Sequence, residues 1–162
     1  MGGKVLSGFT NGYAGAISRA VDDIVISLGN GTDEEEIAFG RPVFLVSGQE
    51  ACIPFDAETC TADNFLGFTV RAADKTPEVY GSNRAAYVPG EPVDVLVRGS
   101  MAVTMDSSAQ VGSPVYIRKA DGALVTNPGA EGTTVLLPNV TVRRNRDSTR
   151  TAEIVITERN II

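Results

Sequence analysis

The chain has 162 residues, of which 43% are hydrophobic and 21% charged, and its formal net charge is −6. This length fits one domain with a single core, and no apolar run approaches the ~18 residues of a membrane-spanning helix. The acidic balance argues against nonspecific nucleic-acid binding, which needs a basic surface, and the lack of a signal-like apolar block predicts synthesis in the cytoplasm.

Residues 1–20 predict an extended arm rather than a packed element. They are rich in glycine and alanine, they sustain no helical apolar period, and their aromatic residues are Phe9 and Tyr13. An arm of this kind either stays disordered or becomes ordered against a neighbouring protein. Residues 21–162 are expected to form one β-rich domain.

The domain is expected to be all-β, a small barrel or sandwich of about eight to ten short strands. Glycine and proline separate the strand-like runs, and no alternation of strands with helices is present. Apart from the central stretch of residues 87–105, the expected strands are residues 22–28, 37–47, 49–55, 65–72, 112–119, 123–126, 133–142 and 151–157.

Residues 87–105 give the clearest strand signal. Three valines, Val93, Val95 and Val97, alternate with other residues until Gly99 and Ser100 interrupt the run. This pattern predicts two strands joined through a glycine bend or bulge, with one face turned inward.

Three other segments have turn or loop signals. Gly40 lies inside the run of residues 37–47, which indicates a bulge or a close backbone contact. Asp121 and Gly122 lie between two strand-like runs, which predicts a tight hairpin. Residues 73–86 are polar and predict a long loop that contains Tyr80, and such loops often carry binding surfaces.

Three polar clusters each allow more than one interpretation. Residues 33–36 are four consecutive carboxylates, which favours a solvated loop because a calcium loop alternates its ligands. Cys52 and Cys60 are close enough in sequence for a disulfide, although reduced thiols are more typical of a cytoplasmic product. A basic cluster either forms a solvated turn or meets an acidic surface or a phosphate; it comprises Arg143, Arg144, Arg146 and Arg150.

The chain has no histidine, which excludes Ser-His-Asp and Cys-His catalysis and any histidine-containing metal centre. Acidic pairs such as Asp56 and Glu58 leave a carboxylate-dependent hydrolase open. Sugar-cleaving sites are usually lined with aromatic residues, however, and this chain is only 6% aromatic with no tryptophan. We therefore expect no enzymatic activity, no metal site and no cofactor.

Four strand-and-turn motifs occur in a familiar order, and they read IAFGRPV (residues 37–43), FLGFTV (65–70), YVPGEPVDVLVRGSMAV (87–103) and GSPVYIRKADGAL (112–124). Together they resemble the structural cement, or decoration, proteins of tailed-bacteriophage capsids. The resemblance covers roughly residues 35–126. It implies a β-rich barrel or sandwich outside the head shell, a non-enzymatic dimer or trimer that binds where capsomers meet and stabilises the expanded shell.

On this basis we expect a virion protein on the outer capsid surface, made in the host cytoplasm. Its partners would be the major capsid protein and further copies of itself, as a homotrimer in preference to a homodimer, without nucleic acid or membrane. The family has no short contact motif, so the contact residues are our own assignment: Phe9, Tyr13, Tyr80, Arg143, Arg144 and Arg146. The arginines would pair with capsid carboxylates.

Two alternatives belong to other classes of protein. One is another virion or tail component, or a carbohydrate-binding β module, for which Tyr80 and Tyr87 are the available aromatic residues near a loop. The other is the carboxylate-dependent hydrolase, with Asp56 and Glu58.

Overall fold

The computed structural model describes residues 10–72 and 86–160. The strands in these ranges are β1 (Ile17–Asn30), β2 (Ile37–Ala38), β3 (Pro42–Leu45), β4 (Ala51–Pro54), β5 (Phe65–Thr69), β6 (Ala86–Tyr87), β7 (Pro92–Thr104), β8 (Pro114–Arg118), β9 (Leu124–Val125), β10 (Thr134–Arg144) and β11 (Thr151–Ile156). A short 3-10 helix, η1 (Ala62–Asn64), precedes β5. Within the described ranges no helix is long and apolar enough to cross a membrane. The all-β prediction is confirmed.

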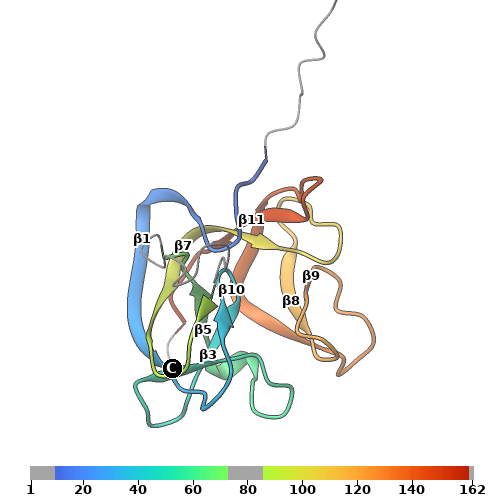
Figure 1. Cartoon of the computed structure of the whole chain (residues 1–162). Coiled ribbons are helices and arrows are strands. Elements are labelled where there is room, and N and C mark those ends of the chain that lie inside the picture. The colour runs from blue at the N-terminus through green and yellow to red at the C-terminus, as the bar shows by residue number, and fades with distance from the viewer. Residues whose placement is uncertain (1–9, 73–85, 161–162) are drawn as a thin grey trace, which may run out of the picture.

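One sheet contains nine of the strands, in the order β1-β4-β3-β5-β7-β11-β10-β8-β9, and β2 pairs with β6 separately. Because β1 pairs with β7 as well as with β4, strands β1, β4, β3, β5 and β7 close into a small barrel. The sheet then continues from β7 through β11 and β10 to the β8–β9 hairpin, on the right of Figure 1. The fold is therefore a barrel joined to an open sheet through a shared strand.

Strand β7 is the shared strand, and its structure contradicts two predictions made for residues 87–105. It is one strand of 13 residues rather than two. It is also buried on both faces, since Val95, Leu96 and Val97 are all 0% exposed. Both faces are covered because Val95 and Val97 pack into one hydrophobic core and Leu96 packs into another. Along its edges β7 pairs with β1 on one side and with β5 and then β11 on the other.

The two hydrophobic cores lie on opposite faces of β7. The barrel core contains Val93, Val95 and Val97 of β7, together with residues of β3, β4 and β5. The second core lies against β8, β10 and β11, and it takes Leu96, Met101 and Val103 from β7. Odd-numbered side chains thus change cores at Gly99, whose φ of 123° is open to glycine and strained for other residues. The glycine bend expected there is present within a continuous strand.

A second glycine lets β5 approach β7 closely. A Cβ on Gly67 would collide with the carbonyl oxygen of Leu96, which belongs to the backbone and cannot rotate away. The β5–β7 pairing at Phe68–Leu96 and Thr69–Val95 closes the barrel on that side. Gly67 therefore sets the distance between two strands of the barrel.

The apolar run at residues 37–47 forms two short strands instead of one. Gly40, with a φ of 70°, turns the chain between β2 and β3. A Cβ on Gly40 would press on the backbone of Ala14 and Gly15. The predicted close backbone contact at Gly40 is thus confirmed, and its partner is the segment that enters β1.

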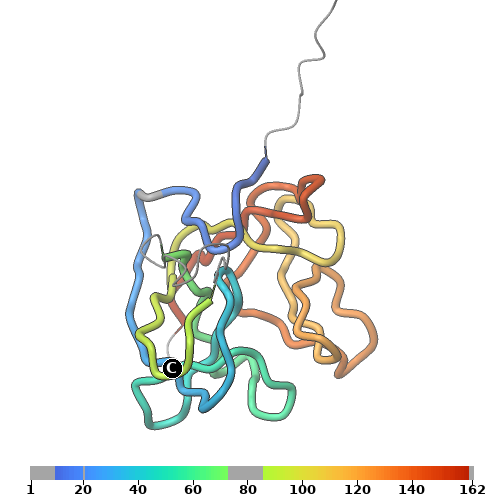
Figure 2. The backbone as a smooth tube through the Cα atoms, viewed as in Figure 1, coloured from blue at the N-terminus to red at the C-terminus, as the bar shows by residue number. Residues whose placement is uncertain are grey.

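The predictions for the C-terminal half agree with the structure. Strands β8 and β9 form an antiparallel hairpin, and Gly122 has a φ of 68° in its turn. Strands β10 and β11 form the last antiparallel pair. The connection between them, residues 145–150, contains Arg146 and Arg150, and we call it the basic loop. The hairpin and the long β10–β11 pair can be followed in the trace of Figure 2.

The two cysteines lie in different cores. Cys52 belongs to the barrel core and Cys60 to the second core, and both are free, buried thiols. Desolvation raises the pKa of Cys52 to about 11 and also raises the pKa of Cys60. The structure therefore supports the interpretation as reduced thiols over the disulfide.

The close approach at Gly67 gives a first prediction. Gly67→Ala should lower the free energy of unfolding by about 2–3 kcal/mol, because overpacking against a fixed backbone cannot relax. Gly29→Ala is the matched control, because a Cβ at this strand glycine would meet only an ordinary contact at 3.7 Å. Urea denaturation of both variants measures the difference, and equal effects would contradict the role of Gly67.

The cysteines give a second prediction. At pH 8 both thiols should react with a disulfide reagent only as fast as the protein unfolds, because the reactive thiolate is disfavoured by burial. The labelling rate in native buffer, compared with the rate in 6 M guanidinium chloride, measures this. Rapid labelling of either thiol in the native protein would contradict its burial.

Candidate functional site

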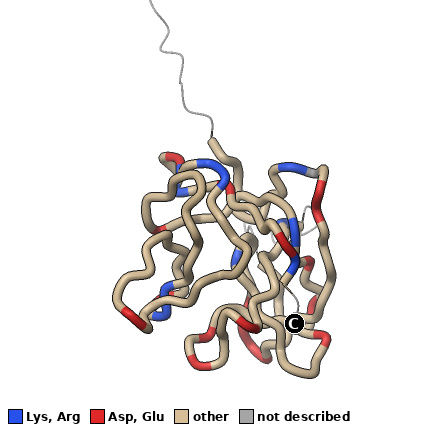
Figure 3. Tube along the Cα trace, turned by 180° about the vertical axis from the view of Figure 1, so that it is seen from behind, with Lys and Arg blue, Asp and Glu red and all other residues tan. Residues whose placement is uncertain are grey.

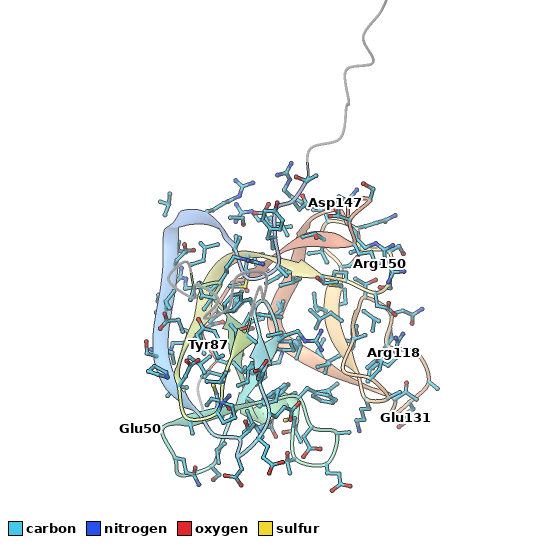
Figure 4. The ribbon with its side chains drawn as sticks, viewed as in Figure 1. Glu50, Tyr87, Arg118, Glu131, Asp147 and Arg150 are labelled. Atoms are coloured by element: carbon cyan, nitrogen blue, oxygen red, sulfur yellow. The ribbon has the colours of Figure 1, made fainter. Side chains whose placement is uncertain are left out.

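The predicted arm and the predicted basic loop meet at one end of the molecule. The backbone N–H of Asn11 donates to Oδ2 of Asp147 at 2.7 Å. Its side-chain amide donates to the carbonyl oxygens of Asn145 at 2.8 Å and Thr151 at 2.7 Å. Figure 4 places Asp147 and Arg150 at the end from which the arm leaves. We call this region the arm-root surface: residues 10–16, Arg71, Val111 and residues 145–151.

The base of the arm is built into the fold. The N–H of Gly15 donates to the carbonyl of Ala102, and the N–H of Ala102 donates to the carbonyl of Ala16. Ile17 and Arg19 then pair with β7 as the start of β1. Residues 10–19, which fall within the predicted arm of residues 1–20, thus contact the domain.

Tyr13 is exposed at this surface and held by one arginine. Its side chain is 75% exposed, and the guanidinium carbon of Arg71 lies 5.4 Å from the centres of both the Tyr13 and the Phe39 rings. Arg71 also donates through its backbone N–H to the carbonyl of Gly15 at 2.8 Å. A guanidinium over an aromatic ring attracts it, so Arg71 holds the exposed Tyr13 ring in place at this surface.

A second exposed apolar side chain is linked to the arm through Asn145. Val111 is 66% exposed, and its backbone N–H donates to Oδ1 of Asn145 at 3.0 Å. Asn145 is the residue whose carbonyl accepts from Asn11. The arm-root surface therefore combines two exposed apolar side chains with basic residues, a composition typical of protein-contact surfaces.

Asp147 holds the basic loop in its turn and ties it to the arm. One carboxylate oxygen accepts from the backbone N–H groups of Thr149 and Thr151, and the other accepts from Asn11. Partial burial raises the pKa of Asp147, but the hydrogen bonds from Thr149, Asn11 and Thr151 outweigh it and bring the pKa to about 2. The ionised carboxylate is the form that the fold stabilises.

The structure divides the four arginines of the basic cluster between different roles. Nη1 of Arg146 donates to three backbone carbonyls, those of Met105, Asp106 and Ser107, at 3.0–3.2 Å. It therefore joins the β7–β8 connection to the basic loop. Arg150 is 67% exposed at its side chain and lies 3.9 Å from a carboxylate oxygen of Asp106.

Arg143 and Arg144 lie on the sheet beside the arm root. Glu153 of β11 has a side chain only 3% exposed, and it accepts from Nε of Arg19 at 3.0 Å and lies 3.8 Å from Nε of Arg144. Nη1 of Arg143 donates to the hydroxyl of Ser100 at 2.9 Å. We call the group Arg19, Arg143 and Arg144 the arginine face.

Of the six residues proposed from sequence, Phe9 and Tyr80 lie outside the described residues. The other four are described, and the structure places Tyr13 with Arg146 on the arm-root surface and Arg143 with Arg144 on the adjoining sheet. Sequence reasoning missed Asn11, Arg71, Val111 and Asp147. The run Asp-Ser-Thr at residues 147–149 is a turn signal that could have identified Asp147, but its partner Asn11 is 136 residues away.

The carboxylates considered for catalysis or metal binding lie in a turn and in an exposed segment. The Asp56 carboxylate accepts from the N–H of Glu58 and the hydroxyl of Thr59, both at 3.0 Å, and so closes its own turn. The carboxylates of residues 33–36 are exposed. Across residues 10–72 and 86–160 no group of three or more Cys, Asp or Glu side chains is arranged to hold a metal ion.

One comparison with known proteins identifies a family. The family model described as "Structural cement protein (E217 gp24/Pam3 gp6)" matches residues 3–157. A chain in the capsid of Myoviridae phage XM1 superposes with a TM-score of 0.70 at 18% identity, over 98% of both chains, and this likeness concerns the fold. The N base of head fiber gp8.5 of bacteriophage phi29 matches with a TM-score of only 0.42 at 12% identity, over 86% of this chain and 98% of that one. Among curated proteins none matches the chain.

The low pKa of Asp147 gives a third prediction. Because the folded-state pKa of about 2 lies below the ordinary 3.8, Asp147 stabilises the fold above about pH 4, and this contribution is lost as the pH falls towards 2. Asp147→Asn should therefore flatten the decline of unfolding free energy between pH 5 and pH 2, measured by urea denaturation. Asp63→Asn, at an exposed position, is the control. Parallel curves for wild type and Asp147→Asn would contradict the role of Asp147.

Proposed function

The chain belongs to the structural cement proteins of bacteriophages, and from that premise we propose that it binds the outside of an assembled capsid where capsomers meet and stabilises the expanded shell. The observation that carries the proposal is the family match over residues 3–157, nearly the whole chain. The role is structural: the protein is a capsid-associated component of the virion.

The arm-root surface is the part of the domain best suited to contact the shell. It joins the arm to a rigid base through Asn11 and Gly15, and it presents Tyr13 and Val111 to solvent. Aromatic side chains and arginines carry much of the binding energy in protein interfaces. A base held in place and joined to a further contacting segment can bind a capsid protein over two adjacent patches, which multiplies affinity through effective concentration.

The contact residues follow from this arrangement. We assign Phe9, Tyr13 and Tyr80 to contacts with the major capsid protein, and Arg143, Arg144 and Arg146 to carboxylates of neighbouring proteins in the shell. Most of the guanidinium hydrogen bonding described for Arg146 is to backbone carbonyls of its own chain, so its contribution would come mainly from shaping the loop.

Assembly and place of action complete the proposal. The protein is made in the host cytoplasm and added to the outer surface of the head, as a homotrimer in preference to a homodimer. Many weak contacts repeated over a symmetric shell give large total stabilisation.

Within the described part of the chain Tyr13 is the one strongly exposed aromatic side chain, so the aromatic platform typical of a carbohydrate-binding module is not seen there.

The arm gives a fourth prediction. Deleting residues 1–9 should reduce occupancy of expanded capsids that lack this protein by about a hundredfold or more, because the second point of attachment is lost. Occupancy is measured by co-sedimentation and densitometry. The deletion ends before Asn11 and Gly15, so the domain should keep its melting temperature.

Tyr13→Ala is the companion variant, which should weaken capsid binding without changing the melting temperature. Undiminished occupancy by the truncated protein would contradict the proposed role of the arm in capsid binding. Undiminished occupancy by Tyr13→Ala would contradict the proposed role of Tyr13.

A further inference from the structure

The arginine face is a cationic surface on an acidic protein. It gathers Arg19 from β1 with Arg143 and Arg144 from β10, three strands apart in the sheet order β1-β7-β11-β10. Within this group one carboxylate, Glu153, is buried between Arg19 and Arg144. Arg98, Asp22 and Asp23 adjoin this group, so four positive charges stand against three negative ones and the local balance is slightly positive, although the whole chain has a net charge of −6.

The three guanidinium groups are held in place, but they keep N–H donors available for a partner. The side chains of Arg19 and Arg144 are 53% and 48% exposed, although each has its Nε on Glu153. Arg143 is exposed and gives one Nη1 donor to Ser100. Because a guanidinium has five N–H donors, each arginine keeps donors directed to solvent while one of its nitrogens is fixed.

A cavity of about 460 Å³ adjoins the arginine face. It is lined by Arg19 and Arg143, by Asp22 and Asp23 of β1, and by Ser100 of β7. The two carboxylates differ in their surroundings. Asp22 accepts from Arg98 at 2.8 Å, and one oxygen of Asp23 is buried where a Cβ on Gly99 would be. The part of the cavity that suits a further carboxylate is therefore the side formed by Arg19 and Arg143.

The chain also carries a complementary surface with no assigned role. Asp33, Glu34 and Glu35 are exposed in the β1–β2 connection. In the described part of the chain none of these three side chains forms an ion pair with a cation. Figure 3 shows acidic residues along the loops of the lower end and most basic residues nearer the end from which the arm leaves. Arg19 lies near the start of β1, whereas Asp33, Glu34 and Glu35 follow the end of this 14-residue strand, so the acidic segment lies away from Arg19 of its own chain.

We propose that the arginine face of one copy binds the acidic segment Asp33–Glu34–Glu35 of a neighbouring copy, in a head-to-tail contact. A contact between two unlike surfaces closes into a ring when the rotation permits, which is consistent with the homotrimer proposed above. The inference therefore rests on the proposed self-association, and it identifies the surfaces that produce it.

The strength of the contact follows from its exposure. An exposed ion pair raises an association constant by about fivefold at most, and salt screens it over a distance of about 8 Å at physiological ionic strength. The contact should therefore be weak and salt-sensitive in free solution. It becomes effective on the shell, where neighbouring copies are held at high local concentration.

The fifth prediction tests the contact with free protein at high concentration. The weight-average mass from sedimentation equilibrium should rise above the monomer mass of 17.0 kDa at 50 mM salt and return towards it at 500 mM. Arg143→Glu should abolish the rise, and so should Glu34→Lys combined with Glu35→Lys. Two controls with the same changes of net charge, Arg159→Glu and Glu131→Lys combined with Glu158→Lys, should associate as wild type does.

Mixing the two non-associating variants gives the decisive measurement. Arg143→Glu retains its acidic segment, and the Glu34→Lys, Glu35→Lys variant retains its arginine face, so an equimolar mixture should form a dimer of one copy of each. If Arg143→Glu fails to fold, as judged by its melting temperature, Arg143→Gln takes its place.

A wild-type protein that stays monomeric at low salt would overturn the proposal, and so would association unaffected by either variant, or a mixture that remains monomeric. The measurement uses no capsids, so it fails or succeeds independently of capsid binding. If the truncated protein no longer occupied capsids but still self-associated, the result would show that capsid binding by the arm is independent of the contact made by the arginine face.

Discussion

The fold depends on one strand, β7, that is shared by two cores. Its first half supplies three valines to the barrel and its second half supplies Met101 and Val103 to the open sheet. This change of core requires the backbone conformation that Gly99 provides, and the closure of the barrel requires the close approach that Gly67 permits. Two residues without side chains therefore allow a closed barrel and an open sheet to share a strand.

The same strand supports the surface that we assign to capsid binding. The second half of β7 accepts the arm root at Ala102 and pairs with β11 at Glu153. The arm root is thus fixed to the centre of the fold, and Asn11 joins it to the turn that Asp147 organises. A cement protein needs such a base, because an arm bound to a partner can transmit a restraint to the domain only if its near end is held.

Charge distribution separates the two kinds of contact proposed for this protein. The arm-root surface combines apolar side chains with a few arginines and suits a specific, lasting contact with a capsid protein. The arginine face and the acidic segment Asp33–Glu34–Glu35 are exposed and suit a weak contact between copies. In the proposed assembly, a self-contact of this strength would act mainly on the shell, where neighbouring copies would be held at high local concentration.

The sequence by itself determined the class of the protein and much of its local structure. Alternating apolar residues and glycine-containing turns were sufficient for the all-β class and the β8–β9 hairpin, because these signals act between residues near in sequence. Gly40 indicated a close backbone contact, but only the structure identified its partner, Ala14 and Gly15. The order of four such blocks was sufficient for the resemblance to cement proteins. The absence of histidine excluded whole classes of catalysis, because the chemistry of those classes needs an imidazole whatever the fold.

Only the tertiary structure decided how the strands share faces and which distant residues form the site. The valines of β7 could not reveal a strand buried on both sides, because burial of the second face depends on β11 and β10, which follow much later in the chain. Likewise, Asn11 meets Asp147 and Arg19 meets Glu153 across more than 130 residues. Such pairs leave no local pattern, since they are produced by strand order, and strand order is set by which sets of side chains pack into a common core.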